Sequence, residues 1–359
     1  MIKKDAPPLS TIYLYFSSAC NLACRHCWID PEFSGSQDIF GIDLPLDKII
    51  NSLEECIPLG LNSVKITGGE PFIRQDIFGL LDYLAARKIN ISVESNGTLI
   101  KEKEARAIKA AGVFHIAVSL DAPTEALHEE LRQVKGSFKK TIEGIGHLKK
   151  AGINNIQIIT CLWRRNAGTL KEMISFTKSL GVGSLKINPV SPTCRANSLK
   201  KDDMLLSVRE VVDIYQKLRP DCNQNGLSVF FDLPPALLAF EDFKKGILGC
   251  CSIKNLLGII ADGTISICGI GKNVDKLVLG KSGKDRIKDI WENSPILKQI
   301  RQEIPWKLQG VCGRCIFRFY CLGKCRAEAF YETGDLLEPF YICQEAYRED
   351  FFPKSRMTP

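Results

Sequence analysis

Three cysteines in the segment "SSACNLACRHCWI" (residues 17–29) have the type and spacing of a metal site. Cys20, Cys24 and Cys27 share one short stretch, and no fourth cysteine lies near them. A cubane 4Fe–4S cluster normally takes four thiolates, so three thiolates leave one iron with an open position that can bind a substrate. The alternatives are a zinc site that lacks one ligand and three structural thiols. The spacing favours a metal site over structural thiols.

A second motif, "ITGGEP" (residues 66–71), follows a predicted strand. Ligands of parallel α/β folds bind at this end of the strands. Gly68 and Gly69 allow the backbone to approach a ligand closely. Glu70 can accept a hydrogen bond from an ammonium group. Gly68 lies 41 residues after Cys27, beyond one further strand, and this combination is far more specific than either motif alone.

Together, the three cysteines and the Gly-Gly-Glu-Pro run resemble the radical S-adenosylmethionine enzymes. In that family, the open iron of a 4Fe–4S cluster chelates the amino and carboxylate groups of S-adenosylmethionine. Reductive cleavage then gives a 5′-deoxyadenosyl radical, which abstracts a hydrogen atom from the substrate. The resemblance implies that Gly68, Gly69 and Glu70 hold the amino end of the methionine moiety.

Later positions extend this resemblance. The segments "ESNGT" (94–98) and "VSLD" (118–121), with Arg132, imply that Asn96, Ser119 and Arg132 contact the ligand, Arg132 on its carboxylate. His26 stands where the family prefers an aromatic or apolar residue against the adenine, and an imidazole can also stack there. The alternatives are a simple turn at Asn96, a helix-capping loop at Ser119 and a surface charge at Arg132.

Cysteines also gather near the C-terminus. Cys312, Cys315, Cys321 and Cys325 are separated by two, five and three residues, and Cys343 follows. A zinc ribbon is the alternative for the first pair. With the N-terminal motif present, the set resembles the SPASM extension of radical S-adenosylmethionine enzymes, which carries two auxiliary 4Fe–4S clusters and brings the expected total to three.

The resemblance implies two interleaved ligand sets in this extension. They are Cys312, Cys315, Cys321 and Cys343 for one cluster, and Cys268, Cys325 and one or both of Cys250 and Cys251 for the other. Adjacent side chains in an extended chain point apart, so joint ligation by Cys250 and Cys251 is awkward. We expect Cys251 to be the ligand. The cluster held by Cys251, Cys268 and Cys325, called the nearer auxiliary cluster below, can then retain an open iron.

Strands and helices alternate from residue 11 to about residue 190. Strands are predicted over 11–16, 63–68, 89–95, 114–120, 155–162 and 184–190, and helices over 46–60, 76–87, 101–111, 137–151, 169–180 and, further on, 203–218. Crossovers of this length join parallel neighbours. Periodicity leaves an open sheet and a partly closed barrel as alternatives.

The resemblance implies the barrel. The expected fold is therefore α/β, a partial (β/α)6 barrel of parallel strands with a small cysteine-rich C-terminal iron–sulfur domain. Residues 222–235 are rich in turn residues and proline, so we place the boundary there. The predicted domains are 11–235 and 236–359, and the second is expected to contain a hairpin around Asp262–Gly263.

Composition excludes several classes of protein. A chain of 359 residues buries enough surface to fold without disulfides, so its fifteen cysteines do not indicate a small secreted scaffold. It has no signal-peptide pattern and no run of eighteen apolar residues, which predicts a cytoplasmic protein without membrane spans. The net charge of +7 is scattered and predicts no nucleic-acid partner.

Relatives of this kind modify ribosomally made peptides, mature sulfatases or trim tetrapyrroles. Sulfatase maturases carry an acidic general base at the position of Gly269, so this residue argues against sulfatase maturation. We expect a peptide maturase that forms a cross-link or an oxidation at an unactivated carbon. No residue is assigned as its catalytic acid or base.

The predicted partners follow from this expectation. The first strand begins at residue 11, which leaves no room for a fused leader-binding domain, so a separate recognition protein or direct leader binding is expected. A flavodoxin- or ferredoxin-type protein would supply electrons. The alternatives are a tetrapyrrole side-chain enzyme of haem synthesis and a non-catalytic electron-transfer protein. Basic residues at the barrel mouth would suit the propionates of a tetrapyrrole, and the candidates are Lys186, Arg195, Arg164 and Arg165.

Overall fold

The computed structural model describes residues 6–33, 42–223, 226–243, 251 and 253–358. Cys250, one of the predicted iron ligands, lies outside the described residues.

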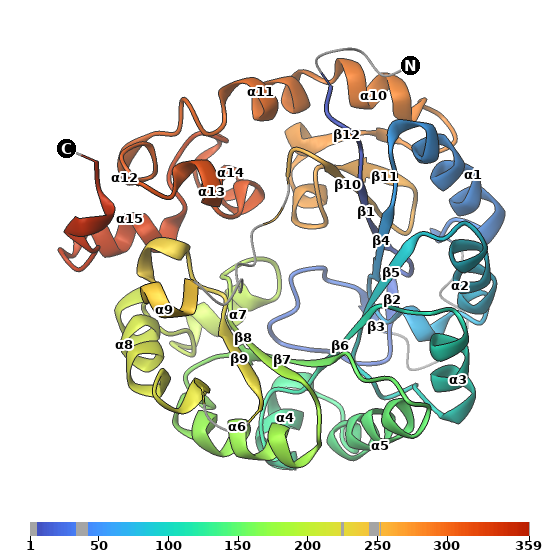
Figure 1. Cartoon of the computed structure of the whole chain (residues 1–359), viewed down its shortest axis with the longest axis horizontal. Helices are drawn as coiled ribbons and strands as arrows, with labels where there is room; N and C mark the ends of the chain where they lie inside the picture. The colour runs from blue at the N-terminus through green and yellow to red at the C-terminus, as the bar shows by residue number, and fades with distance from the viewer. Residues whose placement is uncertain (1–5, 34–41, 224–225, 244–250, 252, 359) are drawn as a thin grey trace.

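Six parallel strands form the centre of the molecule. They are β1 (Thr11–Tyr15), β4 (Ser63–Thr67), β5 (Asn90–Ser95), β6 (His115–Ser119), β7 (Ile156–Leu162) and β8 (Ser184–Pro189). They lie side by side in chain order, and every neighbouring pair is parallel. Figure 1 shows them as an arc, with the segment that follows β1 lying over its middle. This confirms the predicted parallel α/β architecture.

The sheet continues beyond both ends of this arc. β9 (Ser228–Phe231) is parallel to β8, and β10 (Leu256–Ile259) is parallel to β1. β9 was not predicted: it lies within the stretch 222–235 that is rich in turn residues and proline, and its four residues form a strand by pairing with β8. β10 and β11 (Thr264–Ser266) form the predicted hairpin, and β12 (Val278–Lys281) pairs with β11.

A separate two-stranded sheet joins β2 (Ala19–Cys20) to β3 (Glu32–Phe33). It closes the base of the loop that carries the three N-terminal cysteines.

Helices cover the outside of the arc (Figure 1). They are α1 (Leu46–Cys56), α2 (Ile77–Ala86), α3 (Glu102–Ala110), α4 (Glu125–Arg132), α5 (Ser137–Lys150), α6 (Leu170–Ser179) and α8 (Val208–Leu218), whereas α7 (Ala196–Lys201) is labelled inside the arc beside β8. α4 and α7 were not expected from the sequence, because each is too short to show a clear periodicity. α1 buries Ile49, Leu53 and Cys56, and the chain turns away at Gly60, whose φ of 105° favours glycine.

The C-terminal region is mainly helical. Its helices are α9 (Phe240–Phe243), α10 (Ile287–Asn293), α11 (Pro295–Glu303), α12 (Gly310–Gly313), α13 (Arg318–Cys321), α14 (Arg326–Thr333) and α15 (Tyr341–Arg348). Because β10 pairs with β1, this region is joined to the barrel sheet through main-chain hydrogen bonds. The division into domains 11–235 and 236–359 remains a proposal.

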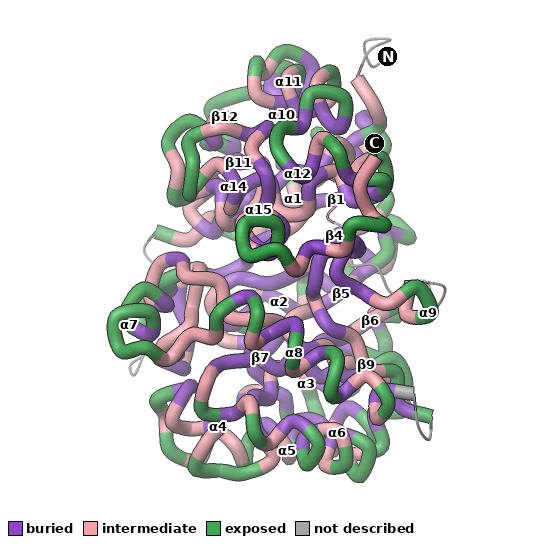
Figure 2. The backbone as a smooth tube through the Cα atoms, turned by 90° about the vertical axis from the view of Figure 1, so that its left-hand side faces the viewer, coloured by how far each residue is buried: buried purple, intermediate pink, exposed green. Residues whose placement is uncertain are grey.

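One continuous apolar core lies between the strands and the outer helices. Ile12, Val64 and Ile66 are fully buried, as are Val93 and Ile116. Figure 2 shows the strands mostly as buried tube and the outer helices with exposed faces. None of the helices in the described ranges has the length and apolar character needed to cross a bilayer.

Candidate active site

The loop of residues 20–27 brings the three N-terminal thiols together. Cys20 and Cys24 are each 6% exposed and pack in one small cluster with Cys27. Two main-chain hydrogen bonds fix the loop against α4, from Ala23 to Arg132 and from Arg25 to Leu131. Burial raises the pKa of all three thiols. Three soft sulfur donors in one half-buried loop fit an iron–sulfur cluster.

The Gly-Gly-Glu segment lies directly against this loop. The Gly69 N–H donates to the Ser17 carbonyl at 2.8 Å, and the Glu70 N–H donates to the Ala19 carbonyl at 2.9 Å. A Cβ at residue 69 would stand 2.0 Å from the Ala19 carbonyl oxygen. Gly68 has a φ of +136°, and a Cβ there would stand 2.8 Å from the Ser17 carbonyl oxygen. Both glycines are therefore required for the two segments to meet.

Glu70 ties this segment to the one that follows β5. Its buried carboxylate accepts hydrogen bonds from the Ser95 hydroxyl at 2.8 Å and from the N–H groups of Asn96 and Phe72 at 2.7 and 3.2 Å. Burial raises the pKa of Glu70 to about 7. The Asn96 amide in turn lies 3.9 Å from the Cys20 sulfur. Glu70 thus fixes the geometry around the cysteine loop, and its contact with a bound ligand stays a prediction.

Arg132 is 6% exposed, so it is no surface charge. From the end of α4 its guanidinium donates to the Asp121 carboxylate at 2.5 Å and to the Cys24 sulfur at 3.5 Å. Burial alone would raise the pKa of Asp121, but the Arg132 charge lowers it to about 2. Ser119 ends β6, two residues before Asp121, and is partly buried. The structure therefore brings Asn96 and Arg132 to the cysteines, and Ser119 ends the strand that leads to Asp121.

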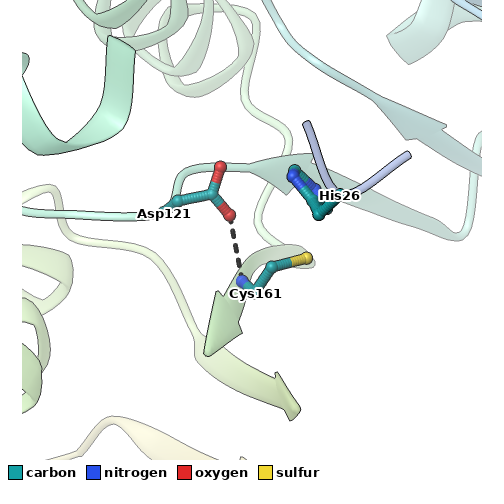
Figure 3. A group of neighbouring side chains, drawn as sticks. All are labelled: His26, Asp121 and Cys161. Atoms are coloured by element: carbon teal, nitrogen blue, oxygen red, sulfur yellow. Dashed lines mark hydrogen bonds between the residues drawn. The ribbon is translucent and has the colours of Figure 1, made fainter. Parts of the chain in front are cut away.

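His26, Asp121 and Cys161 converge beside this pair (Figure 3). One donor atom of each lies within 4.8 Å of the others. The Asp121 oxygens already accept from Arg132 and, at 2.9 Å, from the Cys161 N–H, which favours a ligand pocket over a further metal site. Burial lowers the pKa of His26 to about 4, so its ring is neutral at pH 7. A neutral imidazole is suited to stack on an adenine.

The C-terminal cysteines form two separate groups. Four of them line one small cavity and are at most 9% exposed, and these are Cys312, Cys315, Cys321 and Cys343. The Cys312 and Cys343 thiols hydrogen-bond to each other, which lowers the pKa of Cys312 to about 7. Cys251, Cys268 and Cys325 line a second, larger cavity. The grouping matches the interleaved sets expected from the sequence, and both sets offer the soft sulfur donors that iron–sulfur clusters take.

Two family models match the chain. The model of the radical SAM superfamily covers residues 14–177, and the SPASM model, an iron–sulfur cluster-binding domain, covers residues 250–316. The chain is a radical S-adenosylmethionine enzyme with a SPASM domain. It therefore uses 4Fe–4S clusters and S-adenosylmethionine, and the separate reading as a non-catalytic electron-transfer protein is excluded.

Curated relatives resemble this enzyme over nearly its whole length. An AdoMet-dependent heme synthase of Nitratidesulfovibrio vulgaris is 26% identical and aligns with 100% of this chain and 96% of its own. The mycofactocin maturase MftC of Mycobacterium tuberculosis is 27% identical over 99% of this chain and 87% of its own. Among solved structures, Streptococcus suis SuiB bound to S-adenosylmethionine superposes with a TM-score of 0.73 at 19% identity, over 95% of this chain and 78% of that one. This last likeness supports the fold.

A cavity of about 410 Å³ is lined both by residues at the N-terminal cysteines and by residues of the C-terminal region. Its wall includes His26 of the cysteine loop, Trp28 directly after the loop, and Cys251, Cys268 and Cys325. A substrate in this cavity would lie between the radical source and the nearer auxiliary cysteines.

Charged side chains from the strands also face this cavity. Lys65 of β4 pairs with Glu94 of β5. Asp232 accepts from Lys186 of β8 at 3.3 Å and from Lys324 of the C-terminal region at 2.6 Å. Sequence reasoning missed all of these except Lys186, although a charged residue inside a buried strand is a signal that could have found Lys65 and Glu94.

The basic residues expected at the barrel mouth separate in the structure. Of the four basic residues expected there, Lys186 alone lines the cavity. The arginines form ion pairs elsewhere, Arg164 with Glu210, Arg165 with Glu130 and Arg195 with Asp30. Three of the four therefore do not line the cavity and pair with acidic residues that no sequence pattern links to them. Arg195 still lies beside the cysteine loop, where its N–H donates to the Cys27 carbonyl at 3.3 Å.

Gly269 has a steric reason to lack a side chain. A Cβ there would stand 2.2 Å from the Tyr15 phenol oxygen, and this ring also lines the cavity. The space where sulfatase maturases are expected to carry an acid is thus occupied by Tyr15. Trp28 packs edge-on against the same ring, with centroids 5.8 Å apart. Tyr15 and Trp28 were not identified from the sequence, because their neighbourhood depends on segments far apart in the chain.

Proposed function

We propose that this enzyme modifies a ribosomally made peptide at an unactivated carbon, forming a cross-link or an oxidised product. The observation that carries the proposal is the cavity of about 410 Å³ between the cysteine loop and the residues Cys251, Cys268 and Cys325. A peptide side chain fits such a volume, since ligand cavities of about 300–1,000 Å³ hold drug-sized groups.

The cofactor contacts are proposed residue by residue. Cys20, Cys24 and Cys27 hold the cluster, and S-adenosylmethionine lies between Gly68–Glu70, Asn96, Ser119, Arg132 and His26. When bound, the cluster supplies the electron that cleaves S-adenosylmethionine and so yields the hydrogen-abstracting radical.

The chain's own residues position and shield this chemistry. Glu70 holds the two glycine-bearing segments in register, and Asp121 fixes the Arg132 guanidinium beside the cysteine loop. Buried strands and the covering loop keep water away from the reactive centre, which protects a radical from side reactions. Preorganised groups of this kind need no rearrangement when the charge of the ligand arrives.

Two relatives support a peptide substrate. The M. tuberculosis relative is named a mycofactocin maturase, and SuiB was also solved bound to its precursor peptide SuiA. A separate leader-recognition protein and a flavodoxin- or ferredoxin-type electron donor are part of the proposal. The two auxiliary ligand sets, with Cys251 in the nearer one, belong to it as well.

The test is a product analysis under anaerobic conditions. The reconstituted enzyme is incubated with S-adenosylmethionine, a reductant and synthetic peptides from short reading frames beside its gene. We expect 5′-deoxyadenosine and a peptide mass lowered by one or more hydrogen pairs, localised by fragmentation. Cleavage of S-adenosylmethionine with every peptide unchanged, while a propionate-bearing tetrapyrrole loses mass, would reject the peptide assignment.

A tetrapyrrole side-chain reaction is the second candidate. It is favoured by the heme synthase relatives, which align with nearly the whole chain. Lys65, Lys186 and Lys324 also line the cavity, where propionates would compete with their present partners Glu94 and Asp232. Ammonium groups pair with propionate carboxylates. The same incubation with a propionate-bearing tetrapyrrole distinguishes the two, because loss of carbon dioxide changes the mass by a characteristic amount.

A further inference from the structure

An exposed apolar surface lies beside the outer group of cysteines. We call it the aromatic face, and it consists of Trp306, Ile316, Phe319 and Tyr320. These side chains are 71%, 47%, 50% and 46% exposed. Trp306 and Phe319 are in edge contact with ring centroids 4.8 Å apart, so residues 306 and 319 form one surface. Four large exposed apolar side chains within fifteen residues indicate an interaction site.

Two residues of the aromatic face are direct sequence neighbours of cysteines that line the outer cavity. Ile316 follows Cys315 directly, and Tyr320 precedes Cys321. Both thiols are less than 10% exposed and line the cavity with Cys312 and Cys343. Arg318 lines the same cavity and stacks over the Phe319 ring at 4.9 Å, so the aromatic face lies beside these cysteines.

Basic side chains without an acidic partner lie around the aromatic face. Of the five basic residues in 304–327, Arg326 is buried, Lys324 pairs with Asp232 and Lys307 pairs with Glu303, which leaves Arg314 and Arg318. Exposed Arg314 and partly exposed Arg318 lie in this stretch, and Arg318 stacks over the Phe319 ring at 4.9 Å. The C-terminal segment adds Lys354 and Arg356, held there by hydrogen bonds from Ile316 to the Arg356 carbonyl and from Thr358 to the Arg314 carbonyl. None of these four cations makes an ion pair within the part of the chain that the structure describes.

We propose that the aromatic face and its basic rim are the docking site for a small acidic electron carrier of the flavodoxin type. An apolar centre with a rim of one charge matches the anatomy of transient protein–protein interfaces. The positive rim would attract an acidic carrier and orient it, and such attraction acts mainly on the association rate. The proposal deepens the proposed function, which needs an electron carrier but does not locate one.

Binding of oxidised recombinant flavodoxin to the reconstituted enzyme tests this site by calorimetry, without peptide or S-adenosylmethionine. We expect micromolar binding at low salt that weakens steeply as salt is added, because salt screens exposed charges. The double variant Arg314→Glu/Lys354→Glu should weaken binding by about tenfold or more. Phe319→Ser should also weaken it by about fivefold or more, because it removes a central apolar contact.

Matched variants on the barrel serve as controls. Phe114 is 70% exposed between α3 and β6, and Lys139 and Lys140 are exposed on α5. Phe114→Ser and Lys139→Glu/Lys140→Glu should bind flavodoxin as the wild type does. Iron content and the rate of dithionite-driven S-adenosylmethionine cleavage should match the wild type in all variants, which excludes misfolding as the cause.

Three outcomes would overturn the proposal. They are no flavodoxin binding by the wild type at low salt, equal binding by the wild type and both aromatic-face variants, and self-association of the enzyme that Phe319→Ser abolishes. Because the measurement uses no substrate, failure of every peptide to react would reject the proposed function and leave this result unaffected.

Discussion

The backbone N–H of Gly269 donates a hydrogen bond of 2.9 Å to the phenol oxygen of Tyr15, although the residues stand 254 positions apart. Tyr15 ends β1 of the barrel, and Gly269 directly follows Cys268, a predicted auxiliary ligand. This bond therefore ties the segment of the nearer auxiliary site to the first strand of the barrel. Tyr15 and Gly269 also determine which side chains fit at this part of the cavity wall, because the Tyr15 ring fills the space beside residue 269.

Substitution of Gly269 should be poorly tolerated. Gly269→Asp places a side chain on the Tyr15 ring and should lower the free energy of unfolding by about 1–3 kcal/mol, as overpacking does. Tyr15→Phe should cost about 1–2 kcal/mol because the Gly269 N–H loses its acceptor. Chemical denaturation measures both, and a double-mutant cycle with Tyr15→Ala should show strong coupling. Additive effects would mean that the two residues do not compete for space.

Iron content should report three clusters. We expect about twelve iron atoms in the reconstituted enzyme, and about eight after Cys20, Cys24 and Cys27 are all changed to alanine. The triple variant should form no 5′-deoxyadenosine, because the iron with an open position is lost. Iron analysis and chromatography of the nucleoside measure this. About four iron atoms with one or two zinc atoms in the wild type would contradict the auxiliary clusters.

Single alanine changes at Cys250 and Cys251 should differ. Cys251 lines the large cavity with Cys268 and Cys325, so Cys251→Ala should remove roughly one cluster's worth of iron, about four atoms. Cys250→Ala should remove little. Iron analysis and electron paramagnetic resonance of the reduced proteins measure this. Equal and complete loss from both variants would indicate joint ligation and a closed cluster.

The buried Arg132–Asp121 ion pair should contribute far more to stability than an ion pair on the surface. Arg132→Ala leaves the buried Asp121 carboxylate without its counter-charge and should cost about 3–5 kcal/mol of stability. It should also weaken S-adenosylmethionine binding, whereas Arg132→Lys should restore part of the stability. The control is Arg106→Ala, because Arg106 and Glu102 are more than 60% exposed and such pairs contribute about 0–1 kcal/mol. Thermal unfolding and equilibrium dialysis provide the readouts.

The contribution of Asp232 to the free energy of unfolding should not change with pH near neutrality. Burial raises the pKa of this carboxyl, but Lys186 and Lys324 outweigh it and lower the pKa to about 2 from an ordinary 3.8. A lowered carboxyl pKa gives stability that is complete above the unfolded value and is lost as pH falls from 3.8 toward 2. Asp232→Asn should lower the free energy of unfolding by about 1–3 kcal/mol. This cost is smaller than for a fully buried ion pair, because solvent screens partly exposed charges.

This difference between wild type and Asp232→Asn should stay constant from about pH 8 to about pH 5, since both pKa values lie lower. Calorimetric unfolding at several pH values measures it. A difference that shrinks steadily across this range would mean that Asp232 titrates there and that the two lysines do not hold it ionised.

Local sequence determined the chemistry of this protein. The spacing of Cys20, Cys24 and Cys27 and the two glycines before Glu70 are short-range patterns, because a metal loop and a tight backbone approach are built from neighbouring residues. The strands and most helices of the barrel were also predictable, since their apolar periodicity lies within each segment. α4 and β9 were not predicted from the sequence, because each is too short to show a period.

Tertiary structure alone decided which distant residues meet. Arg132 became a buried partner of Asp121, and Lys186 reached the cavity while Arg164, Arg165 and Arg195 were paired elsewhere. The role of Gly269 depends on the Tyr15 ring, which reaches it through the pairing of β1 with β10. Such contacts join segments up to 254 residues apart, and their selection depends on how the strands pack, which no local pattern encodes.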